Sequence, residues 1–217
     1  MAARLKIDRV LEMKPDLLIL QECSRTDIAA VNAKFSYWVG HNPNKGLGVL
    51  GFGDHTFGID ESFREDLTWF IPIRVTDLSI HVLALWASRT TKKDGYVREA
   101  HKAMIHYETF LRSTPSVVLG DFNSNTIWDH LHPGQSHSDL VRRFESFGLE
   151  SLYHSSHNEL QGKETISTFF MYRKPDHGYH IDYVFVSQSL LPKAKLEIPK
   201  SDEWLKLSDH IPITITI

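Results

Sequence analysis

The sequence predicts a layered α/β or α+β protein, and three observations lead to this fold class. Short apolar segments of strand length outnumber the segments with helical periodicity. The helical segments are scattered among the strands, which argues against a sandwich made of strands alone. The 217 residues contain no stretch with the composition of a linker, so we expect one globular domain over residues 1–217.

The helices are predicted from the spacing of apolar residues. Ile7, Val10 and Leu11 recur at helical spacing and Pro15 ends the pattern, so the chain should begin with an amphipathic helix over residues 3–13. Two further helices fit residues 96–112 and 138–147.

Strands are predicted where short apolar runs end in polar residues or turn signals. The first is "DLLILQE", whose unbroken apolar run is typical of a strand buried on both faces. The others cover residues 47–52, 69–75, 78–87, 116–121, 180–187 and 211–217. The segment 151–165 is polar and aperiodic, which predicts a surface loop.

Composition limits the class of protein. No apolar run approaches the roughly 18 to 20 residues that span a bilayer, and the first residues form no apolar signal-peptide core, so we expect a soluble protein. The net charge of -3 excludes a wholly basic surface, so a polyanionic substrate would be met by a local patch or by metal ions. Cys23 is the single cysteine; this favours a reducing compartment, and we expect a cytoplasmic protein.

Polar side chains recur at places where buried strands begin or end. Side chains at positions i and i+2 of a strand project to the same side, so Asp121 and Asn123 can address one ligand while Phe122 points into the core. The full set of such sites is Glu22 in "LLILQE", Asp121 and Asn123 in "GDFN", Asp182 in "HIDYVFV", and Asp209 with His210 in "LSDHIPITI".

Each of these sites, taken alone, also has a structural explanation. A glutamate after a strand is usually a solvated terminus, Asp-x-Asn often forms an Asx-turn, and an aspartate before a histidine is unremarkable. Asp182 is harder to explain in this way, because it lies in an otherwise apolar strand, where an unpaired carboxylate is costly. A histidine partner would remove that cost.

Taken together, "LILQE", "GDFN", "IDYVF" and "SDHIPI" occur in this order over residues 17 to 213. With these four segments the sequence resembles the endonuclease/exonuclease/phosphatase superfamily, which includes pancreatic-type deoxyribonucleases, apurinic endonucleases, and inositol-phosphate and sphingomyelin phosphodiesterases. The resemblance implies a four-layered α/β/β/α sandwich of two packed mixed sheets flanked by helices. It also implies a site at the top of the two sheets with one or two Mg²⁺ or Mn²⁺ ions.

The resemblance assigns the metal ligands. It makes Glu22 the principal ligand and Asp209 a second carboxylate near the metal. Oxygen ligands of this kind suit hard divalent cations, which also bind phosphate oxygens directly.

The resemblance also assigns catalytic roles around the scissile phosphate. His210 would contact the phosphate, and Asp182 would bond to the far ring nitrogen of His210 and support the imidazolium. Asp121 would orient or deprotonate the attacking water, or protonate the leaving oxygen, while Asn123 would hold a phosphate oxygen. The reaction implied is attack of water on a phosphorus ester.

Other residues are weaker candidates. Trp86 and Arg98 are possible substrate contacts, although a core tryptophan and a solvated helix face explain them equally well or better. The remaining candidates are Lys102 on the helix with Arg98, the possible rim contacts Asn42, Asn44 and Lys45, and Asp129, His130, His132 and His137 in "DHLHPGQSH", whose spacing matches no strong zinc pattern.

One departure from the family pattern concerns the start of the sequence. Family members open with a strand ending in Trp-Asn or a similar pair, whereas this sequence opens with the helix and has its first asparagine at Asn32. We therefore expect an N-terminally incomplete domain, either from a misplaced start or from a truncation. Its sheet would expose unpaired N–H and C=O groups along one edge, and catalysis would be weak or absent until the chain is extended upstream.

Three functional hypotheses follow. The first is a metal-dependent phosphodiester hydrolase, a nuclease of DNA or RNA, which the small size of the chain favours. The second is a phosphatase or phosphodiesterase of a small phosphorylated metabolite or lipid headgroup, which the acidic charge balance suits better. The third is a catalytically inactive binding module with the family fold.

Overall fold

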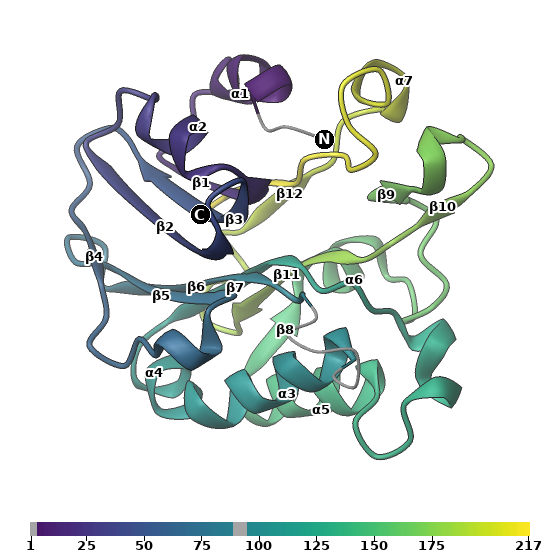
Figure 1. Ribbon diagram of the computed structural model, residues 1–217. Helices are drawn as coiled ribbons and strands as arrows, with labels where there is room; N and C mark the ends of the chain where they lie inside the picture. The colour runs from purple at the N-terminus through teal and green to yellow at the C-terminus, as the bar shows by residue number, and fades with distance from the viewer. Residues whose placement is uncertain (1–3, 89–94) are drawn as a thin grey trace.

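The computed structural model describes residues 4–88 and 95–217. Two main sheets pack against each other, and helices cover the outer face of each sheet (Figure 1). This is the sandwich arrangement predicted from the sequence. Within the described ranges, no helix is both long and apolar enough to cross a membrane.

The first sheet is antiparallel and has the strand order β1-β3-β2. Its strands are β1 (Leu17–Cys23), β2 (Phe35–Asn42) and β3 (Lys45–Gly51). Helices α1 (Arg4–Leu11) and α2 (Arg25–Ala29) belong to this half of the molecule. Ile7 and Val10 of α1 and Ile28 of α2 share a buried apolar cluster with residues of β1 and β3, as the helical spacing of the first residues predicts.

The second sheet has six strands in the order β4-β5-β6-β7-β11-β8. Neighbours are antiparallel except β6 and β7, which are parallel. The strands are β4 (Phe57–Ile59), β5 (Phe70–Val75), β6 (Ile80–Trp86), β7 (Ser116–Asp121), β8 (Leu149–Ser151) and β11 (Asp182–Ser187).

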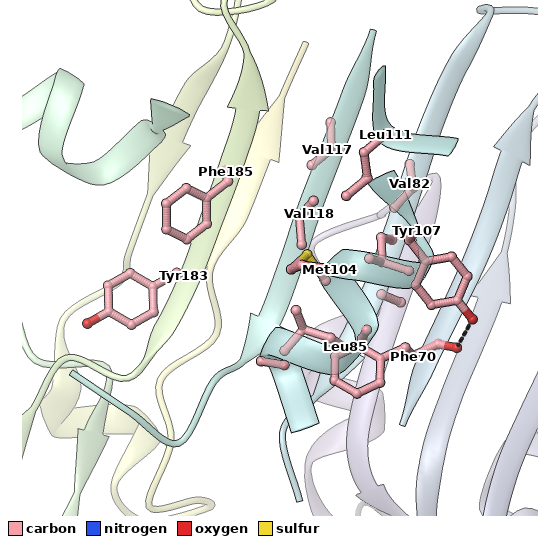
Figure 2. Close-up of a cluster of buried hydrophobic side chains, with 14 of the residues drawn as sticks. Phe70, Val82, Leu85, Met104, Tyr107, Leu111, Val117, Val118, Tyr183 and Phe185 are labelled. Carbon is pink, nitrogen blue, oxygen red and sulfur yellow. Dashed lines mark hydrogen bonds between the residues drawn. The ribbon is translucent and has the colours of Figure 1, made fainter. Parts of the chain in front are cut away.

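Helices α3 (Tyr96–His106), α4 (Glu108–Ser113), α5 (His137–Ser146) and α6 (Leu152–His157) pack against this sheet. Figure 2 shows Met104, Tyr107 and Leu111 packed with Phe70 and Val118 in the main core, where the Tyr107 hydroxyl also donates a hydrogen bond to the Phe70 carbonyl (3.4 Å). The predicted single helix over residues 96–112 is wrong in this detail. It is two helices that meet at Tyr107, which is fully buried.

Shorter elements complete the fold. Two small antiparallel pairs join β9 (Phe169–Phe170) to β10 (Gly178–Tyr179) and β12 (Lys195–Glu197) to β13 (Thr214–Thr216). The remaining helical turns are η1 (Glu65–Leu67), η2 (Thr126–Leu131), η3 (Met171–Arg173) and α7 (Ser201–Trp204). The last predicted strand, 211–217, is therefore shorter than expected.

The prediction of a surface loop over residues 151–165 is wrong for its first half. Residues 152–157 form α6, and Tyr153 is buried against the rings of His157 and His180. The segment looked like a loop because its polar side chains bond to one another instead of to water. For example, the Tyr153 hydroxyl donates to Glu159 Oε2 (2.8 Å).

Strand β1 has one unpaired side. It pairs with β3 alone among the strands of the described residues, so it forms an edge of the first sheet. A cavity of about 460 Å³ lies beside this edge and is lined mostly by apolar side chains from β1, β7, β11 and residues 211–217.

Candidate active site

Neighbouring strands bring the acidic residues of two sequence motifs together. Asp121 at the end of β7 lies directly opposite Asp182 at the start of β11 in the strand register. His210 joins them from the C-terminal segment, which is tied to the sheet by a bridge between Phe169 and His210. One ligand atom from each of Asp121, Asp182 and His210 lies within 4.8 Å of the others.

The backbone at the end of β7 requires glycine. Gly120 has φ +146°, and a Cβ atom added there would lie 1.9 Å from the carbonyl oxygen of Leu85. Only a residue without a side chain allows β7 to pass this close to β6. The glycine of "GDFN" therefore sets where Asp121 leaves the sheet.

Asp121 and Asn123 form one unit. The Asn123 side-chain amide donates to Asp121 Oδ2 (2.7 Å) and to the Ala87 carbonyl (3.1 Å), and the Asn123 backbone N–H donates to Asp121 Oδ1 (2.8 Å). This is the Asx-turn given above as the structural explanation of the Asp-x-Asn pattern, and it lies within the candidate site. Asp121 is 4% exposed; burial raises the pKa of its carboxyl, and the charge of Asp182 raises it further.

Asp182 has the histidine partner that its strand position predicts. His210 Nδ1 lies 3.0 Å from Asp182 Oδ2 and 3.2 Å from Oδ1. Burial disfavours the imidazolium, but the Asp182 carboxylate outweighs it and raises the pKa of His210 to about 9. With Nδ1 bonded to Asp182, Nε2 is the nitrogen left to act as a donor.

Glu22 is re-aimed by an irregularity in β1. The register with β3 shifts between Gln21 and Cys23, and Glu22 has φ +57°. Such a bulge turns a side chain away from the regular alternation of the strand. Glu22 Oε1 then lies 3.0 Å from the Lys45 ammonium, which stands over the ring of Trp86 (5.1 Å to the centroid).

The two predicted metal ligands lie outside the closest cluster. Among the residues that the structure describes, neither Glu22 nor Asp209 belongs to a group of three metal-binding side chains within 4.8 Å; Asp121, Asp182 and His210 do. Both carboxylates are still near. The charge of Glu22 raises the pKa of Asp121, and the charge of Asp209 contributes to the raised pKa of His210.

The donor set suits a hard divalent cation. The centre offers carboxylate oxygens from Asp121 and Asp182, with those of Glu22 and Asp209 nearby, and such oxygens are the donors that Mg²⁺ and Mn²⁺ prefer. Lys45 beside Glu22 shows that the site already attracts cationic charge. The residues present therefore fit a divalent metal ion.

Lys6 is a site residue that sequence reasoning missed. Its ammonium on α1 donates to Ser208 Oγ (3.1 Å), and Ser208 Oγ also accepts the backbone N–H of His210 (3.1 Å). Burial lowers the pKa of Lys6, while the charges of Asp209, Glu22 and Asp182 oppose this change. The available signal was its position one turn before Val10, on the apolar side of the predicted helix.

The weaker candidates are distributed differently. Trp86 is 3% exposed and contacts Trp69 edge to face, so it is a core residue that also supports Lys45. Arg98 is exposed on the first turn of α3, and Lys102 bonds to Glu99 (2.7 Å). Asn42 accepts the backbone N–H of Asn44 in the β2–β3 turn (2.9 Å).

The segment "DHLHPGQSH" has a structural role. Asp129 Oδ1 accepts the backbone N–H groups of His137 (2.9 Å) and Ser138 (3.3 Å) at the start of α5. His137 is buried beside Ser124, and burial lowers the pKa of His137 to about 4. His130 and His132 join no group of metal-binding side chains in the part of the chain that the structure describes.

An aromatic recess of about 290 Å³ adjoins the centre on the side of Asn123. Trp128 and Tyr179 both line it and pack on each other with tilted rings, whose centroids are 5.3 Å apart. Phe169, which also lines it, packs on the His210 ring at 4.8 Å. Sequence reasoning missed these residues, although Tyr179 lies two residues before the "IDYVF" segment.

Solved structures share this fold. A 3'-5' exonuclease from Neisseria meningitidis superposes with a TM-score of 0.70 at 19% identity, over 99% of this chain and 95% of that one. A 3' phosphatase from Neisseria bound to a product DNA hairpin matches at 0.70 and 18%, over 99% and 95%. An AP endonuclease from Archaeoglobus fulgidus matches at 0.70 and 20%, over 99% and 94%.

The sequence comparisons agree with the fold. No curated protein matches the sequence. The model of the Endonuclease/Exonuclease/phosphatase family matches residues 6–210, nearly the whole chain, including all the residues that meet at the centre. Endonucleases of nucleic acids, exonucleases and phosphatases all hydrolyse phosphoester bonds, and by this match the chain belongs to that family.

Proposed function

We propose that the chain is a Mg²⁺- or Mn²⁺-dependent phosphodiesterase that cleaves DNA or RNA. The observation that carries the choice of substrate is the aromatic recess beside Asp121 and Asn123. Aromatic rings such as those of Trp128 and Tyr179 stack on nucleobase faces, which a lipid headgroup without a ring does not present.

The acidic and imidazole groups have complementary roles in this proposal. Asp182 keeps His210 protonated, so His210 Nε2 donates a hydrogen bond to a phosphate oxygen and stabilises the charge of the transition state. The raised pKa of Asp121 favours proton donation to the leaving oxygen over proton removal from water. Asn123 holds the Asp121 carboxyl in place.

The metal ion would be held on the Glu22 and Asp209 side of the centre, with the Asp121, Asp182 and His210 cluster facing it. When bound, it supplies positive charge that neutralises the phosphate and polarises the phosphorus ester. The Neisseria phosphatase that shares the fold was solved with a DNA hairpin, which supports a nucleic-acid substrate for this chain.

The net charge of -3 favours a second candidate, hydrolysis of a small phosphorylated metabolite or lipid headgroup. Plasmid nicking and oligonucleotide cleavage should be compared with release of nitrophenol from bis-nitrophenyl phosphate, each with Mg²⁺, Mn²⁺ or EDTA. Cleavage of nucleic acid that EDTA abolishes supports the first candidate. Turnover of the small ester alone supports the second. No turnover with retained Mn²⁺ binding supports an inactive binding module.

The roles of Asp121 and His210 can be tested in the same assays. We expect Asp121→Asn and His210→Ala to lower turnover by at least about 100-fold while leaving the circular dichroism spectrum unchanged. Retained activity in either variant removes that residue from the chemistry. Trp128→Ala should raise KM for an oligonucleotide roughly 5- to 100-fold without changing turnover of the small ester.

A further inference from the structure

Lys45 forms an ion pair with Glu22, the carboxylate that the family resemblance makes the principal metal ligand. It is the first residue of β3, directly after the turn that follows β2. Its Nζ lies 3.0 Å from Glu22 Oε1 and 5.1 Å from the centroid of the Trp86 ring. The ammonium therefore has two partners, one anionic and one aromatic.

The backbone and the core together hold this arrangement. The bulge in β1 and the positive φ of Glu22 turn the carboxylate towards Lys45, a backbone conformation that costs free energy and is typically found at functional sites. Trp86 is buried and wedged against Trp69, so it presents a fixed ring face to the ammonium. Trp86 is also the register partner of Asp121 across β6 and β7, so the ring under Lys45 belongs to a residue that neighbours Asp121 in the sheet.

The ion pair is easily broken. The side chains of Lys45 and Glu22 are 51% and 44% exposed, and pairs this exposed to solvent contribute little to stability. A divalent cation carries twice the charge of the ammonium. Because like charges repel at these distances, binding of one cation to Glu22 weakens binding of the other.

We propose that Lys45 is a displaceable counter-ion of Glu22 and that, once displaced, its ammonium binds a phosphate oxygen of the substrate. The carboxylate is held by Lys45 before the divalent cation binds, and the cation then takes Lys45's place. The ammonium stays at the open side of the centre, supported by Trp86. This inference rests on the proposed function, since it requires that the centre bind a divalent metal ion.

The first test measures metal binding without catalysis. Free Mn²⁺ is followed by electron paramagnetic resonance as it is titrated into the protein. We expect Lys45→Met, which keeps the aliphatic stem on Trp86, to lower the Kd for Mn²⁺ about two- to fivefold. Lys45→Arg should resemble the unchanged chain. Lys34→Met is the matched charge control, because Lys34 precedes β2 and pairs with Asp54.

A double-mutant cycle tests whether the effect of Lys45→Met on Mn²⁺ binding acts through Glu22. In a Glu22→Gln background the effect of Lys45→Met should disappear, because the carboxylate for which the two cations compete is gone. An unchanged or raised Kd in Lys45→Met, or an equal change in Lys34→Met, overturns the exchange and leaves the proposed hydrolase intact. Absence of Mn²⁺ binding by the unchanged chain overturns the metal dependence, and the exchange with it.

The second test concerns the phosphate. At saturating Mg²⁺, Lys45→Met should raise KM for an oligonucleotide with kcat nearly unchanged. It should also reduce the slope of log(kcat/KM) against log salt concentration by about one, because one phosphate contact is lost. An unchanged slope and KM overturn the second half of the proposal.

Discussion

At the scale of single residues, the site contains several of the chain's departures from ordinary backbone geometry, others of which lie outside it at residues such as Ser79 and Asn158. Glu22 and Asn123 have φ values of +57° and +48°, and Gly120 has +146°. Conformations of this kind cost free energy and persist only where the surrounding structure imposes them. These three residues lie in two sequence motifs, "LILQE" and "GDFN", at the strand ends that carry polar side chains to the centre.

Gly120 gives a direct test of this geometry. We expect Gly120→Ala to destabilise the protein by at least about 3 kcal/mol, because the added Cβ meets the Leu85 carbonyl at a φ that alanine disfavours. Urea unfolding measures the change. Gly58→Ala is the control: no neighbouring atom lies within 4 Å of its added Cβ, so stability should stay within about 1 kcal/mol. Equal losses in both variants would contradict the assignment.

The Asp182–His210 pair predicts a titration shift in the metal-free protein. Asp182→Asn should lower the pKa of His210 from about 9 towards its ordinary value, because the main favourable charge is lost. NMR titration of the imidazole Cε1–H resonance reports this directly. Asp176→Asn is the control, since Asp176 lies near His177 instead. An unshifted His210 in Asp182→Asn would show that another group protonates it.

The pair also makes stability depend on pH. Because the folded pKa of His210 is raised, its contribution is fully present below the unfolded pKa of 6.5 and is lost as pH rises through about 9. The contribution is at most about 3 kcal/mol and smaller in practice, since the His210 side chain is 29% exposed. Asp182→Asn should flatten this part of the stability profile.

At the scale of elements, the segment from α6 to β10 is hydrogen-bonded to the parts of the chain that carry the site residues. Glu164 Oε1 accepts from His154 Nε2 (3.0 Å) and from the Gly162 backbone N–H (2.9 Å), and Oε2 accepts from the Asn125 amide (3.2 Å). The same Asn125 amide donates to the His180 carbonyl (2.9 Å). Glu164 therefore ties this segment to the two chain segments that carry Asp121 and Asp182.

Glu164 should make the protein sensitive to acid. Burial opposes its charge, but its hydrogen bonds outweigh this and lower the pKa of Glu164 to about 2. A lowered folded pKa gives stability that is present above the ordinary value of 4.5 and is lost as pH falls through about 2. Glu164→Gln should lower the free energy of unfolding by up to about 3 kcal/mol at pH 7. Below pH 4.5, the free energy of unfolding measured with urea should fall less steeply with pH in this variant than in the unchanged chain.

The control for this prediction is Glu145→Gln on the exposed side of α5. It should leave the free energy of unfolding at pH 7, and the fall of that free energy in acid, unchanged. If the free energy of unfolding falls equally steeply in acid for Glu164→Gln and for the unchanged chain, other carboxylates cause the acid sensitivity.

At the scale of the whole molecule, two sheets meet around an incompletely filled interior. The cavity of about 460 Å³ beside the open edge of β1 is lined by side chains of both sheets, including Leu18 of β1 in the first sheet and Leu119 and Val184 in the second. Unfilled apolar volume lowers stability, because the lining atoms lack packing partners. The sheet-on-sheet contact on which the site depends is thus a weak part of the fold.

Filling the cavity should stabilise the protein. Val184→Ile adds one methylene group at a residue that lines the cavity, and we expect a gain of up to about 1 kcal/mol in the free energy of unfolding. Val186→Ile is the matched control. It lies two residues along the same strand, is fully buried and does not line the cavity, so it should cost about 1 kcal/mol or more. A loss in both variants would mean that the cavity walls do not accept added volume.

Sequence patterns predicted the parts of the fold that depend on local burial. The strands "DLLILQE" and "HIDYVFV" and the helices around Val97 and Leu140 are where apolar spacing indicated them. Strand β2 was missed because Ser36, His41 and Asn42 interrupt its apolar pattern. Helix α6 was missed because its polar side chains bond to other residues of the same polar segment, as His154 does to Glu164.

The sequence by itself determined the fold class, the family resemblance and the pairing of Asp182 with a histidine, because each follows from a short pattern or from the cost of burying a charge. Only the tertiary structure decided that Asp121, Asp182 and His210, without Glu22 and Asp209, form the closest cluster, and that Lys6 bonds to Ser208 and Lys45 to Glu22. These contacts join residues far apart in the chain, and strand register and the β1 bulge set them, so no local pattern encodes them.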